Sequence, residues 1–354
     1  MRITNSMLVN NFMRNLNTNL TKMDKLQNQL ATGRKFAHIS DDPTALIYSQ
    51  AARNKIARLS HYQRTIGSAK DWLTQSEFGV MELQKAISSA NEATIDAATS
   101  VKTQADRINL AKVIAQYRDH FVDTLNTTFG DKYVFGGYNT PGEPADGFLT
   151  KGIKPFTVGD VGSEKHLFYN GFDLSQFDGM TLADFNDYIK SPAGAPEQAA
   201  FQELFGDVLI FDVGPGISMP VTMNGIELVL FTTTRDDGVT IIRNAFNVLD
   251  ELNNLCIDFE KPIDELSKML TPLQDAQNHL LTKTAEIGGR NRRLELLEAR
   301  YEQDAINYES MKSDAEDVDM AEIIMFQKMA EAVYQAALSS GARIIQPTLM
   351  DFLR

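Results

Sequence analysis

The residues that could carry out chemistry are few and scattered along the chain. Its single cysteine, Cys256, has no CxxC partner, and the five histidines show no metal-ligand spacing. Neither a phosphate-binding GxxxxGK loop nor a nucleophile-elbow GxSxG occurs. We therefore expect no catalytic residue, no cofactor and no metal, and a chain that is not an enzyme. The histidines are His38, His61, His120, His166 and His279.

An acidic cluster near the C-terminus is the one remaining candidate for a cation site. It runs from Asp314 to Glu322 and holds five carboxylates. The cluster lacks the glycine and the ligand spacing of a calcium loop. Acidic residues also favour the first turn of a helix, where they interact with the helix dipole. We interpret the cluster as the start of a helix.

Composition and charge restrict the class of protein. The 354 residues are 43% hydrophobic and 23% charged, and the net charge is −13. An acidic chain is a poor partner for nucleic acid or for an anionic membrane. One cysteine excludes an internal disulfide framework. No apolar run of eighteen residues occurs and asparagines interrupt the first twenty, which predicts neither a membrane span nor a cleaved signal.

We expect long amphipathic helices to be the main elements of the fold. From Leu59, apolar residues recur at alternating steps of three and four, the spacing of a packed helical seam. A seven-residue step follows from Leu273, and a last stripe starts at Met320. The three stripes are Leu59, Tyr62, Ile66, Ala69, Leu73, Ser76, Val80, Leu83, Ile87, Ala90, Thr94, Ala97 and Val101; Leu273, Leu280, Ile287, Leu294, Tyr301 and Tyr308; and Met320, Ile323, Gln327, Ala330, Tyr334, Ala337, Gly341 and Ile344.

The first long helix has a clear start. Asp42 can cap it while Pro43 takes the first helical position, and the helix should continue to about Ala105. Further helices are expected over 107–129, 241–255 and 273–311. Gly288 and Gly289 lie inside the last of these and should weaken or bend it.

The middle of the chain should be mostly β. Residues 130–240 hold 16 of the 22 glycines and 7 of the 11 prolines, which stop helices. Strand-like runs cover 165–169, 208–213, 217–223 and 226–232, and Asn224-Gly225 predicts a hairpin turn between the last two. A short helix is expected at 182–189. The fold class is thus mainly α with an inserted β domain. We expect three parts: paired terminal coiled-coil arms over 1–40 with 313–354, a long-helix bundle over 41–139 with 240–312, and the inserted domain over 140–239.

The two terminal arms should pair. Residues 1–35 carry six basic side chains against one acid, a net +5, whereas 311–354 carry four basic against seven acidic, a net −3. Seven of the first thirty residues are asparagine, a poor helix former, so this arm should order only against a partner. At the end of this arm we expect Gly33 to form a turn, and Asp42 and Pro43 to cap and begin the helix that follows. The expected assembly interface comprises Leu16, Leu20, Met23, Leu26, Leu30, Ile323, Ile324, Ala330, Tyr334, Ala337 and Ile344.

Several short motifs near both ends resemble the flagellin family. Residues 32–36 (TGRKF) and 40–45 (SDDPTA) resemble its Gly-Arg turn and paired aspartates before the first long helix. Residues 317–322 (DVDMAE) and 346–353 (QPTLMDFL) are similar to its closing segment. Two further motifs, 133–138 (YVFGGY) and 287–291 (IGGRN), look like the branch that joins the flagellar hook to the filament. The resemblance covers about 1–139 and 240–354.

This resemblance implies an extracellular structural protein of the bacterial flagellum, exported unfolded by the flagellar type III apparatus. Its implied partners are further copies of itself in a ring or helical tube, another hook-associated protein, flagellin, and an export chaperone bound through the C-terminal region. The alternatives are flagellin itself, an enzyme carried by the middle domain, and a cytosolic coiled-coil adaptor.

Overall fold

The chain forms two compact units, which we describe separately. The computed structural model describes residues 5–36, 38, 40–99, 103–130, 132–137, 154–162, 164–190, 196–206, 208–235, 237–258 and 263–344. The arm unit comprises residues 1–61 and 300–354, and the body unit comprises 62–299. Val101, Tyr138 and the segment 346–353 lie outside the described residues. The expected three-part division of the chain stays a prediction.

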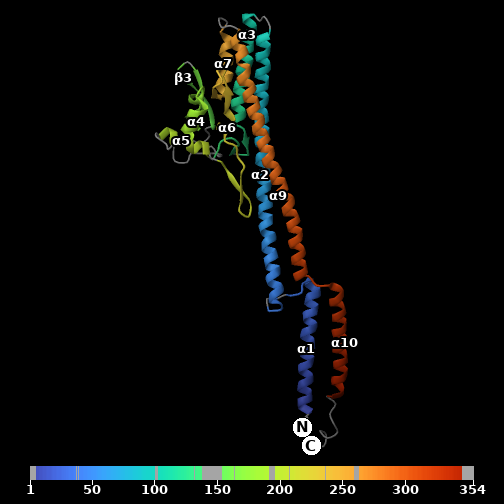
Figure 1. Cartoon of the computed structure of the whole chain (residues 1–354). Helices are drawn as coiled ribbons and strands as arrows, with labels where there is room; N and C mark the ends of the chain where they lie inside the picture. Colours follow the sequence, from blue (N-terminus) through green and yellow to red (C-terminus); the bar gives the residue numbers. More distant parts are fainter. Residues whose placement is uncertain are drawn as a thin grey trace, which may run out of the picture. The chain divides into compact units, whose positions relative to one another are not determined.

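Two terminal helices pair in the arm unit. Helix α1 (Asn5–Thr32) and helix α10 (Met320–Ile344) lie side by side (Figure 1). The carboxylate of Asp319 begins α10 by accepting hydrogen bonds from the Ala321 and Glu322 amides, at 2.9 and 3.3 Å. Asp319 thus acts as a helix cap. The expectation that the whole acidic cluster starts a helix is wrong for Asp314 and Glu316, which lie at the end of the preceding helix α9 (Leu270–Glu316).

The long helix α2 (Pro43–Thr99) begins where the sequence predicts. Asp42 Oδ1 accepts from the Thr44 amide at 3.1 Å and from the Ala45 amide at 3.0 Å, and Pro43 is the first helical residue. The helix ends at Thr99, earlier than the expected Ala105. The next helix starts with a capping box formed by Thr103 and Asp106, which explains the break before it.

The body unit is a bundle of long helices. Alongside the second part of α2 it contains α3 (Gln104–Leu125), α7 (Ala245–Ile257), α8 (Ile263–Lys268) and most of α9 (Leu270–Glu316). From Ile66 to Ala97 every described residue of the α2 stripe is buried, as are the α9 stripe residues from Leu273 to Leu294. The seam periodicity therefore identifies the core. Gly288 and Gly289 do not interrupt α9.

The described part of the inserted region contains small antiparallel sheets and the helices α4 (Leu182–Lys190), α5 (Pro196–Gly206) and α6 (Gly225–Val229). Helices α4 and α5 contribute to a cluster of aromatic rings in which Phe177, Phe185 and Phe201 contact one another in edge-to-face and tilted arrangements. The short helix expected at 182–189 is confirmed. The remaining elements are β1 (Thr128–Phe129), β2 (Lys132–Tyr133), β3 (Phe156–Val161), β4 (Glu164–Tyr169), β5 (Phe172–Asp173), η1 (Ser175–Phe177), β6 (Ile210–Gly214), β7 (Ile217–Pro220), α6 (Gly225–Val229), β8 (Leu230–Thr234) and β9 (Thr240–Asn244).

The hairpin turn predicted at Asn224-Gly225 is wrong. Asn224 instead caps helix α6, since its side chain accepts from the Ile226 amide at 3.0 Å. The position of Gly225 requires glycine because there is no room for a side chain, and not because of a positive φ. A Cβ would overlap the ring of Phe156 and lie 2.8 Å from the Phe135 carbonyl oxygen. The true hairpin in this region joins β6 to β7 and turns at Gly216, where φ is +69°.

Two helix boundaries also differ from the sequence-based expectation. The helix expected over 241–255 begins only at Ala245, because the β-branched pair Ile241-Ile242 lies in strand β9 and Asn244 caps the helix. The helix expected to reach Phe129 ends at Leu125, and Phe129 lies in β1. No helix in the described part of the chain is long and apolar enough to cross a bilayer.

Candidate assembly interface

The seam between α1 and α10 follows the predicted stripe closely. On α10, Ile323, Ala330, Tyr334 and Ala337 are partly buried, and Gly341 is buried, while almost every residue between them is exposed. The same three-four alternation occurs on α1. Its less exposed residues include Val9, Phe12, Leu16, Asn19, Met23, Leu26 and Leu30.

Gly341 allows the two helices to approach closely at one end of the seam. A Cβ built on Gly341 would overlap the aromatic ring of Phe12. A glycine inside a helix costs about 1 kcal/mol of helix stability relative to alanine. At this position the glycine allows the close contact between the two helices that alanine would prevent. Phe12 is not among the expected interface residues, because it lies outside the Leu16–Met23–Leu30 repeat that defines the stripe.

Both arms also carry a second apolar surface that nothing in the described chain covers. On α10 this outer face includes Met325, Met329 and Val333, which are between 48 and 57% exposed. On α1, Met7 and Met13 are exposed as well. Exposed apolar side chains that gather on one side of a helix can mark an interaction surface. The arm unit therefore has one face that closes the helix pair and another that is available for neighbouring molecules.

The expected interface residues differ in how far they are buried. Leu26 is buried, whereas Leu20 is 37% exposed and Ile324 is 47% exposed. The side chain of Ile344 lies outside the described residues. Their role in assembly stays a prediction. The remaining residues of the set, which are partly buried in the seam, are Leu16, Met23, Leu30, Ile323, Ala330, Tyr334 and Ala337.

The turn after α1 fixes where the arms begin. Gly33 has φ +67° and its amide donates to the Gln29 carbonyl at 2.8 Å, which ends the helix. The residues of this turn pair with residues near the other end of the sequence. The Gly33 carbonyl accepts from the Val318 amide at 3.1 Å, and the Lys35 amide donates to the Glu316 carbonyl at 2.6 Å. This backbone pairing holds the two arms in register.

Glu316 is the electrostatic centre of that junction. Its side chain is 2% exposed and accepts a bidentate pair of hydrogen bonds from Arg53, both at 2.6 Å. Ser49 also donates to Glu316, and Arg34 lies 3.9 Å away. The hydrogen bonds from Arg53, followed by that from Ser49 and by the positive charges, lower the pKa of Glu316 from 4.5 to about 2. The carboxylate is therefore ionised and fully paired at neutral pH.

Local sequence carries only weak signals for this junction. Glu316 is one acid in an acidic cluster, and no local pattern links it to Ser49, which lies 267 residues earlier. The resemblance to a Gly-Arg turn at Gly33-Arg34 is the only pointer to this place. Such long-range pairing is visible only in the folded chain.

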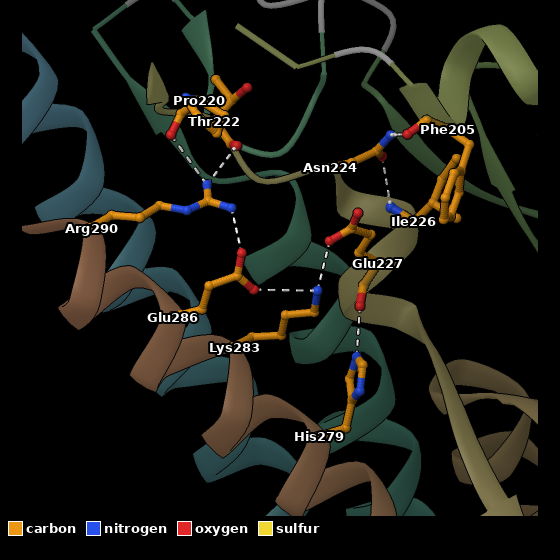
Figure 2. A network of polar contacts seen from close by, with 10 residues as sticks. All are labelled: Phe205, Pro220, Thr222, Asn224, Ile226, Glu227, His279, Lys283, Glu286 and Arg290. Carbon is orange, nitrogen blue, oxygen red and sulfur yellow. Dashed lines mark hydrogen bonds and ion pairs between the residues drawn. The ribbon is translucent and has the colours of Figure 1, made fainter. Parts of the chain in front are cut away.

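In the body unit, the inserted region is anchored to α9 by a polar network (Figure 2). Arg290 donates to the carbonyl oxygens of Pro220 and Thr222, at 3.3 and 3.4 Å, and pairs with Glu286 at 2.5 Å. Lys283 pairs with Glu227 of α6 at 2.6 Å. The family-like segment at 287–291 therefore contributes one arginine that holds the end of a β hairpin.

His279 completes this network from one turn earlier on α9. Its Nε2–H donates to the Glu227 carbonyl oxygen at 2.7 Å, as Figure 2 shows. Burial lowers the pKa of His279, so a neutral ring fills this position and donates through one nitrogen. In the same view Asn224 reaches the Phe205 carbonyl oxygen at 3.2 Å. These groups are mutually satisfied and serve to position the inserted region.

The 133–138 motif has a packing role in the same unit. Val134 and Phe135 are fully buried, and the Phe135 ring lies directly above Gly79 of α2. A Cβ on Gly79 would come within 2.7 Å of that ring. The motif therefore joins the inserted region to the first long helix.

Several titratable side chains of the described residues form ion pairs with one another. Among the described residues, no group of three or more His, Cys, Asp or Glu side chains is arranged to hold a metal ion. His166 pairs with Asp173 at 2.7 Å on neighbouring strands. Arg118 pairs with Asp250 at 2.5 Å, which ties α3 to α7. Cys256 is buried, and burial raises the pKa of its thiol.

Comparison with known proteins finds similarity to proteins of the bacterial flagellum. Residues 3–140 match the family described as the bacterial flagellin N-terminal helical region. The chain is 24% identical to flagellar hook-associated protein 3 of Salmonella typhimurium, over 95% of both chains. It is also 24% identical to the Escherichia coli protein of that name, over 95% of this chain and 96% of the other. In fold it resembles flagellar hook-associated protein 3 of Legionella pneumophila, with a TM-score of 0.55, 10% identity, and coverage of 75% of this chain and 98% of that one.

Proposed function

We propose that this chain, which carries the N-terminal helical region of bacterial flagellins, is a structural protein of the bacterial flagellum that joins the hook to the filament. The resemblance to the flagellin family noted in the sequence is confirmed by the match over residues 3–140. The similarity to flagellar hook-associated protein 3 extends over nearly the full length of both chains. That full-length similarity favours the junction role over the alternative of a bulk flagellin.

The outer apolar face of the arm unit is the observation that carries the proposal. The helix pair already buries its seam, yet Met325, Met329 and Val333 of α10 stay exposed. Burying such side chains contributes about 25 cal/mol for each Å² removed from water. Stacking copies of the chain would cover this face, so assembly and ordering of the arms are coupled. Leu20 and Ile324 would contact the neighbouring copy.

The proposal includes the partners that the resemblance to the flagellin family implies. Copies of the chain associate in a ring or tube, with another hook-associated protein on one side and flagellin on the other. Before assembly the protein is exported unfolded to the outside of the cell, and its C-terminal region binds an export chaperone. Arms that order only on assembly suit this route, because they need no refolding inside the channel.

Removing residues 1–30 tests the proposal. We expect the truncated chain to keep a folded body unit, measured by urea unfolding, and to fail to join the flagellum. A chain carrying Val158→Ala, which changes an exposed residue of the inserted region, serves as a control and should be incorporated normally. Normal incorporation of the truncated chain would contradict the proposal.

Immunogold labelling of intact flagella separates the junction role from that of a filament subunit. We expect label confined to the distal edge of the hook. Label along the whole filament would instead identify a flagellin. Absence from flagella would favour a cytosolic adaptor.

A further inference from the structure

Exposed methionines are concentrated in the arm unit. Six of the methionines described there are between 45 and 57% exposed. In the body unit, by contrast, Met219 and Met223 are buried, and so is Met269, while Met81 is 41% exposed. The arm unit therefore presents thioether sulfurs at its surface, where the body unit mostly buries them. The six exposed methionines of the arm unit are Met7, Met13, Met311, Met320, Met325 and Met329.

Two of these methionines lie on the outer face of α10. Met325 and Met329 are one helical turn apart, so their side chains share one side of the helix. Tyr334, which is partly buried in the seam with α1, follows Met325 by nine residues. At about 100° per residue, that separation places Met325 and Tyr334 on opposite sides of α10. A chemical change at Met325 or Met329 therefore alters the outer face and leaves the seam unchanged.

An exposed thioether can be oxidised, whereas the side chains of leucine and valine cannot. Hydrogen peroxide transfers one oxygen atom to the sulfur, so that the O–O bond breaks, an S–O bond forms and water is released. The sulfur is oxidised by two electrons, and the peroxide is reduced by the same two. The product, methionine sulfoxide, is polar and disrupts surfaces that methionine makes apolar. Methionine sulfoxide reductases reverse the reaction.

The added oxygen acts where the side chain becomes covered. In the free chain it is hydrated, because the side chains of Met325 and Met329 are both more than half exposed. On assembly it would lose this water, and a polar group that is buried without a hydrogen-bond donor opposes burial. The neighbouring base on α10, Lys328, is already engaged, since its ammonium pairs with Glu331 at 3.0 Å. Oxidation at these two positions should therefore weaken contacts made through the outer face.

We propose that Met325 and Met329 are sites of reversible oxidation, and that their conversion to methionine sulfoxide by a peroxide prevents copies of the chain from assembling through the outer face. The inference rests on the proposed function, because stacking of copies is what covers this face. Oxidation acts on the free chain, before assembly removes the two sulfurs from water. The paired helices and the body unit keep their structure.

Mass spectrometry of the full-length chain tests where oxidation occurs. Purified protein is treated with dilute hydrogen peroxide and digested, and each methionine-containing peptide is measured over time. We expect Met325 and Met329 to be oxidised at least about tenfold faster than Met219 and Met223, because the first two are exposed and the others are buried. In assembled protein Met325 and Met329 should react more slowly than in the free chain. Equal rates for the four methionines would overturn the proposal.

Sedimentation of the oxidised chain tests the effect on assembly. We expect oxidation to raise the critical concentration about tenfold or more, and a methionine sulfoxide reductase to restore the original value. A chain that carries Met325→Leu and Met329→Leu should assemble equally well before and after peroxide, because leucine keeps the volume and apolar character without the sulfur. Met81→Leu is the matched control, since it removes an exposed methionine of the body unit. This control should stay as sensitive to peroxide as the unmodified chain.

The outcomes separate this inference from the proposed function. Normal assembly of a chain in which both methionines are oxidised would overturn the inference and leave the proposed function standing. An equal loss of assembly in the double leucine variant would overturn the assignment to Met325 and Met329. So would a loss that comes with a lower free energy of unfolding of the body unit, since the damage would then lie elsewhere. Failure of the untreated chain to assemble at all, alone or on isolated hooks, would overturn the proposed function and the inference with it.

Discussion

Gly341 of α10 packs directly against the aromatic ring of Phe12 of α1, leaving no space for a Cβ. Gly341→Ala should therefore force the arms apart near their outer end. Overpacking of this kind typically costs about 1–3 kcal/mol. On the proposal that the paired arms form the assembly interface, we expect a rise in critical concentration of about tenfold or more, measured by sedimentation.

The control for Gly341→Ala is a glycine substitution in the long helix α9. A Cβ on Gly289 of α9 would meet no atom within 4 Å. Gly289→Ala should thus stabilise its helix by up to about 1 kcal/mol. If both substitutions affected assembly equally, the close approach of Phe12 would not be the cause.

The contact between Gly79 and Phe135 predicts a similar contrast inside the body unit. Gly79→Ala should lower the free energy of unfolding by about 1–3 kcal/mol, because its methyl would press on a fully buried ring. Gly67, on the same helix, has no neighbour within 4 Å of the position that an added methyl group would take. Gly67→Ala should raise the free energy of unfolding slightly. Urea unfolding of the two variants measures the difference, and equal effects would argue against this packing.

The α9 stripe predicts opposite outcomes for two leucines that are two residues apart on opposite sides of the helix. Leu294 is fully buried, whereas Leu296 is 61% exposed. Leu294→Ala should cost about 2–5 kcal/mol of stability through the cavity it leaves. Leu296→Ala should change stability by less than about 0.5 kcal/mol. Thermal or urea unfolding of the body unit gives both values, and a large loss for Leu296→Ala alone would contradict the assigned face of the helix.

The depressed pKa of Glu316 predicts acid sensitivity at the base of the arms. The pKa is 4.5 in the unfolded chain and about 2 in the folded one. The carboxylate therefore stabilises the junction fully above pH 4.5, and this contribution is lost as the pH falls towards 2. A shift of this size corresponds to roughly 3 kcal/mol. Assembled protein should dissociate progressively across that pH range.

Replacing the carboxylate removes this pH dependence. Glu316→Gln should weaken the assembled form at neutral pH and flatten its dissociation profile between pH 4.5 and 2. Glu309→Gln, at an exposed position of the same helix, should leave the profile unchanged. Light scattering during acid titration measures all three proteins. Identical profiles for the Glu316 variant and the unmodified chain would show that the junction does not depend on this charge.

Local sequence determined most of the helical architecture. The three-four alternation from Leu59 to Ala97 identifies the buried face of α2, since residues at that spacing share one side of a helix. Asp42 and Pro43 fix the start of that helix because capping depends on neighbouring residues alone. The family resemblance is likewise readable in short motifs near both ends.

Tertiary structure decided the features that depend on distant residues. Ser49 and Arg53 meet Glu316 across more than 260 residues of sequence, and no local pattern encodes that contact. Asn224-Gly225 has the composition of a hairpin turn, yet the crowding of Gly225 by Phe156 and Phe135 makes it the start of a helix. Periodicity reports which side of a helix is apolar, whereas the partner of each side is set by the packing of the whole chain.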